Sequence, residues 1–141
     1  MNRSTTEFQK TLQQRIDSVL SVNPVKIQRL EAGSVRVNDD VIYTRHNVWH
    51  YRDITFYRRK SAVGYAVAML SNDRETAKRI QTLDQQVMKY KIDLDHYWYH
   101  LKRSKPRSAS YAIMSNRISS DLPNLHHVDK QLTSLLKTVS F

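Results

Sequence analysis

A seven-residue repeat of apolar side chains constrains this chain more than any other feature. Between residues 80 and 101 the apolar positions recur at alternating spacings of three and four without a miss, which is typical of a helix that packs along one seam. The pattern therefore predicts one long helix with a stripe that needs a helical partner. The seam consists of Ile80, Leu83, Val87, Tyr90, Leu94, Tyr97 and Leu101.

A second seam in the same register follows the break at Lys105-Pro106, and only Asp121 fails at its expected position. Two seams of similar length joined by a short loop bury each other when the chain folds back, so we expect an antiparallel helical hairpin. Pro123 leaves two alternatives open, a kink in one helix or the first turn of a restarted helix. The second seam contains Tyr111, Met114, Ile118, Leu125, Val128, Leu132, Leu135 and Val139.

Between residues 35 and 57 the apolar period changes to two, and β-branched and aromatic residues dominate. This pattern predicts a small antiparallel meander of three or four strands. The expected strands are Val35–Val37, Val41–Arg45, Val48–Tyr51 and Ile54–Tyr57, and the expected turns are Asn38-Asp39, His46-Asn47 and Arg52-Asp53.

Two further helices complete the predicted α+β fold. A capping box at Ser4 and Glu7 and a helical apolar stripe predict an N-terminal helix over residues 5–21. Ser61 is placed to cap a short alanine-rich helix that lies on the sheet. We expect an N-terminal part, 1–72, and a helical hairpin, 73–141, within one continuous domain.

Composition excludes several classes of function. The chain of 141 residues has no cysteine, which excludes disulfides and cysteine-ligated metals, and only two glycines, too few for a phosphate-binding loop. It lacks a run of apolar residues long enough to span a bilayer, and its first residues lack the apolar core of a signal peptide. We therefore expect a cytoplasmic, non-catalytic protein without a cofactor and without a membrane partner.

The net charge of +10 favours a polyanionic partner, DNA or RNA. One concentration of cations is interleaved with aromatic residues, whose faces can stack on bases. An alternative interpretation is that the aromatic side chains form the core face of the sheet and the arginines its solvated face. The candidate residues are Arg45, Arg52, Arg58, Arg59 and Lys60, with Trp49 and Tyr51.

A second concentration of cations lies in the loop between the two seams, at Lys102, Arg103, Lys105 and Arg107. Such a loop is exposed and attracts polyanions. It is equally consistent with a solubilising loop whose cations complement the helix dipole.

Asp93, His96 and His100 share one helix face at spacings that resemble half of a carboxylate-bridged metal site. The second seam offers no Glu-x-x-His to complete it, so we predict no metal site.

A structural or assembly role is the alternative to nucleic-acid binding, with a second copy or another protein as partner. It rests on the length of the first seam and on the aromatic surface of Tyr90, Tyr97, Trp98 and Tyr99, a residue type that is enriched at interfaces.

The segment from Val48 to Ala66, with the following Asn72-Asp73 and the heptad helix, resembles small proteins encoded by marine tailed phages. The order of strands and helix is also similar to that of arm-site DNA-binding modules of tyrosine integrases and of plant-type three-stranded DNA-binding domains. The phage resemblance implies a small accessory or virion protein in an infected bacterial cell.

Overall fold

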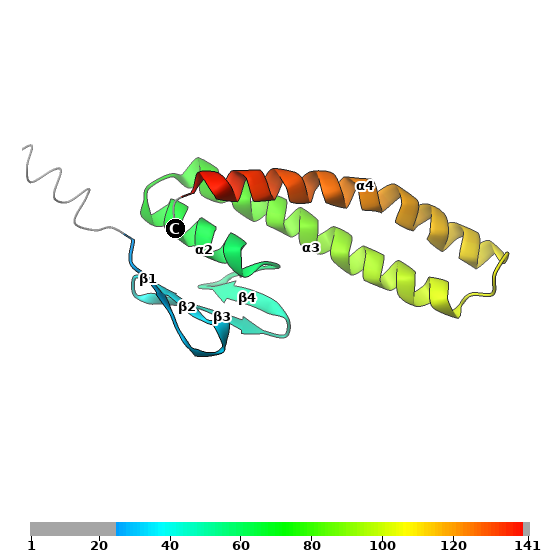
Figure 1. Ribbon diagram of the computed structural model, residues 1–141, viewed down its shortest axis with the longest axis horizontal. Helices are drawn as coiled ribbons and strands as arrows, with labels where there is room; N and C mark the ends of the chain where they lie inside the picture. The colour runs from blue at the N-terminus through cyan, green and yellow to red at the C-terminus, as the bar shows by residue number, and fades with distance from the viewer. Residues whose placement is uncertain (1–24, 140–141) are drawn as a thin grey trace, which may run out of the picture.

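The computed structural model describes residues 25–139, which form an antiparallel sheet followed by three helices (Figure 1). The predicted α+β class is confirmed, whereas the helix expected over residues 5–21 lies outside the described residues. In chain order the elements are β1 (Ile27–Arg29), the 3-10 turn η1 (Glu31–Gly33), β2 (Val35–Val37), β3 (Asp40–Arg45), β4 (Val48–Tyr51), β5 (Ile54–Phe56), α2 (Arg59–Leu70), α3 (Arg74–Arg103) and α4 (Ala109–Thr138).

The sheet is a simple meander in which each strand pairs with the next along the chain. All three predicted two-residue turns are present, and Asn38, His46, Asn47 and Arg52 adopt the positive φ angles that tight hairpins require. The sheet has five strands instead of the three or four predicted, because β1 is an edge strand with no buried residue and hence no apolar alternation to reveal it.

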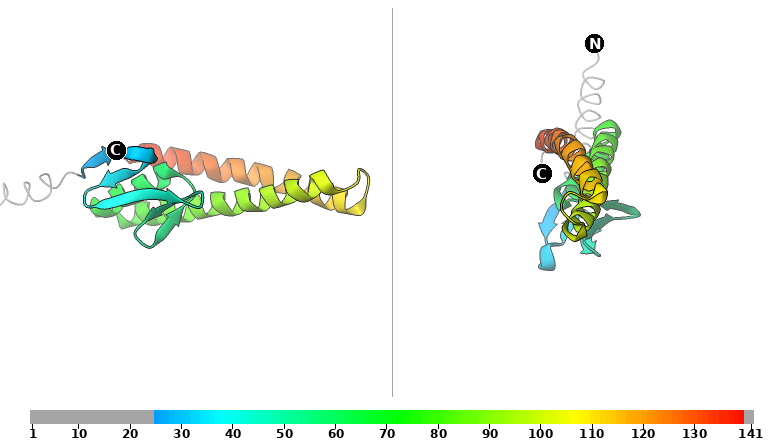
Figure 2. Two further views of the ribbon diagram at one scale, coloured as in Figure 1. Left: turned by 90° about the horizontal axis from the view of Figure 1, so that it is seen from below. Right: turned by 90° about the vertical axis from the view of Figure 1, so that its right-hand side faces the viewer.

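One face of the sheet packs against α2. Alternate strand residues such as Val35, Ile42 and Phe56 form a buried cluster with Ala62 and Ala66 of α2. The small side chains let the helix lie close to the strands. The opposite face of the sheet carries no helix within the described residues (Figure 2).

α3 and α4 form the antiparallel hairpin that the two seams predict, and it extends well beyond the sheet (Figures 1 and 2). Ile80, Val87 and Leu94 of α3 pack in one buried cluster with residues of α4 such as Leu125 and Leu132. α4 runs without interruption through Pro123, so the alternative of a restarted helix is wrong.

Two half-buried residues connect the sheet cluster to the hairpin cluster. Tyr65 of α2 and Val139 at the end of α4 each pack against both clusters. The end of α4 therefore lies beside the helix that covers the sheet.

None of the helices within residues 25–139 is long and apolar enough to cross a membrane.

Candidate nucleic-acid interface

The junction between β5 and α2 is built around a buried carboxylate. Asp84 of α3 is fully buried and accepts hydrogen bonds from the backbone amides of Tyr57 at 2.7 Å and Arg58 at 3.3 Å. Burial raises the pKa of this carboxyl, and the two amides, the Ser61 hydroxyl and the Arg58 charge oppose that shift without cancelling it. Asp84 thereby fixes the start of α2 against the hairpin.

This arrangement corrects the prediction that Ser61 caps the helix. α2 begins at Arg59, three residues earlier than a helix capped by Ser61 would, and its N-cap residue Arg58 makes no side-chain capping bond. Ser61 is fully buried inside the first turn. Its hydroxyl lies beside the Asp84 carboxylate without reaching hydrogen-bonding geometry. The acceptor at this helix start comes from α3 and is therefore invisible to a local sequence pattern.

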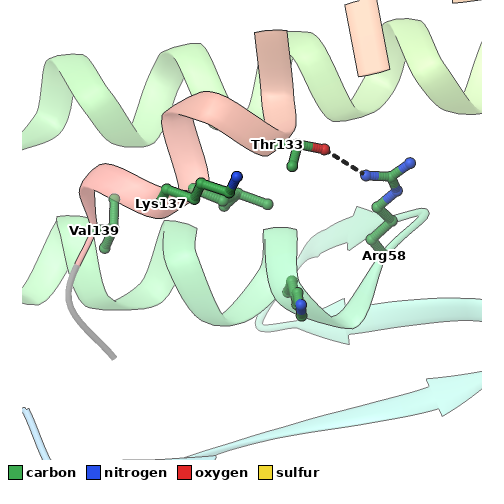
Figure 3. A pocket seen from close by; sticks show the side chains of 6 residues that line it. Arg58, Thr133, Lys137 and Val139 are labelled. Carbon is green, nitrogen blue, oxygen red and sulfur yellow. Dashed lines mark hydrogen bonds between the residues drawn. The ribbon is translucent and has the colours of Figure 1, made fainter. Parts of the chain in front are cut away.

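Arg58 is engaged within the fold. Its guanidinium forms an ion pair with Asp129 of α4 and donates a hydrogen bond to the Thr133 hydroxyl at 3.5 Å (Figure 3). Its charge is thus partly neutralised, and its main effect is to join the sheet–helix junction to α4.

The neighbouring cations converge on the start of α2 from three elements. Lys60 lines two depressions: one of about 420 Å³, shared with Arg58 and with Lys137 of α4 (Figure 3), and one of about 230 Å³, shared with Arg59 and with Arg29 of β1. We call Arg29, Arg59, Lys60 and Lys137 the α2 basic patch. The two ion pairs among the described residues involve none of the four.

The fold fixes the position of Arg59 within this patch. Its guanidinium lies over the ring of Trp49, 5.9 Å from the centroid, and donates to the carbonyl oxygen of Gly33 at 3.4 Å. Gly33 has φ +75°, in the region that favours glycine, which allows η1 to present that carbonyl. The first turn of α2 itself contains no acidic residue, and the carboxylate at this helix start is that of Asp84 from α3.

The other candidate residues of the sheet are distributed over different environments. Tyr51 is 2% exposed, and Trp49 packs against the sheet cluster, so neither ring forms an open stacking surface. The alternative interpretation, in which alternate aromatics form the core face, is correct for these two residues. Arg52 is paired with Asp40 at 2.8 Å. Arg45 is exposed. It lies three positions after the inward-facing Ile42 in β3, so its side chain points to the uncovered face.

The structure corrects the predicted loop: Lys102 and Arg103 belong to the last turn of α3, and only Lys105 and Arg107 lie in the loop. All four cations are exposed, but they lie far from the α2 basic patch. Asp84 marks the place where α3 meets α2, and Lys102 lies 18 residues further along the same helix. At 1.5 Å per residue this is a separation of about 27 Å. The loop and the patch therefore form two separate basic regions (Figure 1).

Within residues 25–139 no three histidine or acidic side chains gather as a metal site. His96 and His100 do lie together, with ring centroids 4.3 Å apart. Asp93 does not complete a ligand group with them.

Sequence reasoning missed two cations of the patch, Arg29 and Lys137, and the carboxylate at its base, Asp84. Arg29 belongs to the edge strand that the pattern did not reveal, and Lys137 is 77 positions from Lys60 along the chain. One signal pointed to Asp84: it lies four residues after Ile80 and three before Val87, on the buried stripe of α3.

No family model, curated protein or solved structure matches this chain.

Proposed function

We propose that the protein binds nucleic acid through the α2 basic patch. The observation that carries the proposal is the position of Lys60, which joins two depressions and brings cations from β1, α2 and α4 together. Like charges gathered around the same depressions repel one another, and a polyanion relieves the repulsion while releasing its own counterions.

The shape of the patch favours an extended anion. Its cations border two adjacent depressions and come from three elements, so successive phosphates of one strand can occupy them in turn. The contacts are with charges and not with base edges, so we expect binding with little dependence on sequence. The loop cations Lys102, Arg103, Lys105 and Arg107 add long-range attraction and a second contact on long nucleic acids.

The resemblance of residues 48–66 to phage-encoded proteins supports the same kind of role. A small accessory protein in an infected cell meets nucleic acid as its most abundant polyanion, and we propose the cytoplasm or the virion as its location.

The proposal predicts a specific response to loss of charge. The double variant Lys60→Gln/Lys137→Gln should lower the affinity for a duplex by about tenfold at moderate salt, and should reduce the slope of log affinity against log salt by about 2. Fluorescence anisotropy with labelled DNA and RNA at several salt concentrations measures both quantities.

The matched control removes two charges from the uncovered face of the sheet. Arg36→Gln/Arg45→Gln changes the net charge by the same amount, and both arginines are exposed strand residues. It should reduce affinity by less than about threefold. Equal losses in the two variants, or wild-type binding that is indifferent to salt, would show that the patch is not the interface.

A structural or assembly role is the second candidate. The heptad seam itself does not favour it, because α3 and α4 bury their seams against each other. The supporting observation is the exposed apolar surface of α3: Ile92 and Tyr99, on the side away from the seam, are 61% and 52% exposed, and Trp98, beside the seam, is 44% exposed.

A further inference from the structure

The distal part of the hairpin has no core of its own. Leu94 on α3 and Ile118 on α4 are the last buried residues before the loop, and none of residues 95–117 is buried. Monomeric proteins rarely leave clustered large apolar side chains in water, and such clusters mark interaction sites. The exposed apolar residues of this region are Trp98, Tyr99, Tyr111 and Ile113, and Ile92 lies just before it.

Charges on the outer side of α3 are arranged symmetrically about one aromatic residue. Asp95, Tyr99 and Arg103 follow at intervals of four, so they lie on one face, opposite the seam. All three are exposed. The Arg103 guanidinium is folded back over the Tyr99 ring, 3.6 Å from its centroid, and donates to the Tyr99 carbonyl oxygen at 3.3 Å.

We infer that this face binds a second copy of the chain, with α3 antiparallel to α3 about a two-fold axis at Tyr99. An antiparallel helix centred there places Asp95 of one copy opposite Arg103 of the other, twice over, with the two Tyr99 rings between them. The face is thus complementary to itself. This inference rests on the proposed structural or assembly role and names a second copy of the chain as the partner.

The acidic residue on this face favours a second copy over nucleic acid. Asp95 repels a phosphate backbone, whereas a second copy uses it as the partner of its own Arg103. Neither Asp95 nor Arg103 forms an ion pair with another described residue. The outer side of α3 also faces away from α4, and the sheet does not reach its distal half (Figure 1).

The overlap between the copies is short. Residues 92–103 span about 18 Å of helix, so the interface falls in the small, transient class. We expect a dissociation constant of about 10 µM or weaker.

Sedimentation equilibrium without nucleic acid, from about 1 µM to about 1 mM protein, tests the inference. The wild type should change from monomer to dimer over this range. Asp95→Arg alone and Arg103→Asp alone should each weaken association by about tenfold or more, because each places like charges opposite one another. The double variant Asp95→Arg/Arg103→Asp should recover association to within about threefold of wild type, because it restores opposite charges across the axis.

Lys78→Asp is the matched control, since it makes the same charge change as Arg103→Asp at an exposed position on the proximal part of α3. It should associate like wild type, and circular dichroism checks that every variant keeps its helices. A strict monomer throughout the range overturns the inference, as does a double variant no better than the single ones. Because no nucleic acid is present, either failure is distinct from failure of the basic patch.

Discussion

The Asp84 carboxylate illustrates how much a single residue decides in this fold. It is fully buried, and it accepts hydrogen bonds from two backbone amides that precede α2. Buried amides without an acceptor cost about 1–3 kcal/mol each. One side chain of α3 therefore holds the sheet–helix junction, and with it the cations of the α2 basic patch.

The raised pKa of Asp84 makes a prediction about stability and pH. Burial raises the pKa in the folded protein above its ordinary value of 3.8, so ionisation costs more in the folded than in the unfolded chain. The contribution of Asp84 to stability is therefore full below pH 3.8 and decreases as the pH rises through the raised pKa. Urea denaturation at a series of pH values should show this decrease in the wild type, and Asp84→Asn should remove it.

Asp84→Ala tests the contribution of the two hydrogen bonds to stability, whereas Asp84→Asn tests the contribution of the titrating carboxyl group. The alanine variant leaves both amides without an acceptor, so we expect a loss of about 2–6 kcal/mol in the free energy of unfolding, largest below pH 3.8. An Asp84→Asn profile that keeps the wild-type pH dependence would contradict a raised pKa at this residue.

At the residue scale, the sequence predicts which residue types occur in the strands better than it predicts the face to which each side chain points. Alternation predicts that aromatic residues divide between two faces, but the packing of α2 decides which face is covered. Trp49 and Tyr51 turn inward with Phe56, whereas Tyr43 stacks on His50, 5.0 Å between ring centroids, on the uncovered side. The sequence likewise shows Arg52 and Arg58 as positive charges but does not show that Asp40 and Asp129 pair with them in the fold.

At the scale of elements, the features predicted well are those encoded by repeated local pattern. The heptad seams predict the α3–α4 hairpin, and the Asn or Asp residues of the pairs Asn38-Asp39, His46-Asn47 and Arg52-Asp53 predict three hairpin turns. The edge strand β1 has no such pattern, because all three of its residues are exposed and it is defined by pairing with β2. Pairing between strands is a tertiary property, so a single-residue pattern does not contain it.

Pro123 lies inside α4 and predicts a stabilising substitution. Proline lacks the amide hydrogen that would bond to the Ser119 carbonyl, and its ring crowds the preceding turn. The side chain is exposed and makes no part of the buried clusters. Pro123→Ala should therefore raise the free energy of unfolding by about 1–3 kcal/mol, measured by urea denaturation.

Asn124→Ala is the control for this substitution, since it changes helix propensity at the neighbouring exposed position without restoring a hydrogen bond. It should change stability by less than about 0.7 kcal/mol. A proline variant no more stable than this control would mean that α4 accommodates Pro123 without strain.

At the scale of the whole molecule, the hairpin separates two basic regions. The α2 basic patch lies where the sheet, α2 and the end of α4 meet, and the loop cations lie at the far end of α3 and α4 (Figure 1). The sequence predicts both concentrations of charge. It does not predict that Lys137 joins the first, because that contact depends on the hairpin returning the chain to α2.

In the proposed dimer, the length of the hairpin would also set the distance between the two α2 basic patches. An axis at Tyr99 places the two sheet modules at opposite ends of the pair. Tyr99 lies 15 residues from Asp84 along α3, so the two basic patches would be about 45 Å apart along the helices. Two patches on one particle favour long nucleic acids, because the second contact is intramolecular.

Amide chemical-shift mapping tests most directly whether the α2 basic patch is the proposed nucleic-acid interface. On titration with a short DNA duplex at low salt, the largest changes should cluster around Arg29, Arg59, Lys60 and Lys137 and fade as salt is added. Changes centred on the uncovered sheet face, around Arg36, Tyr43 and Arg45, or an absence of changes at low salt, would contradict the account.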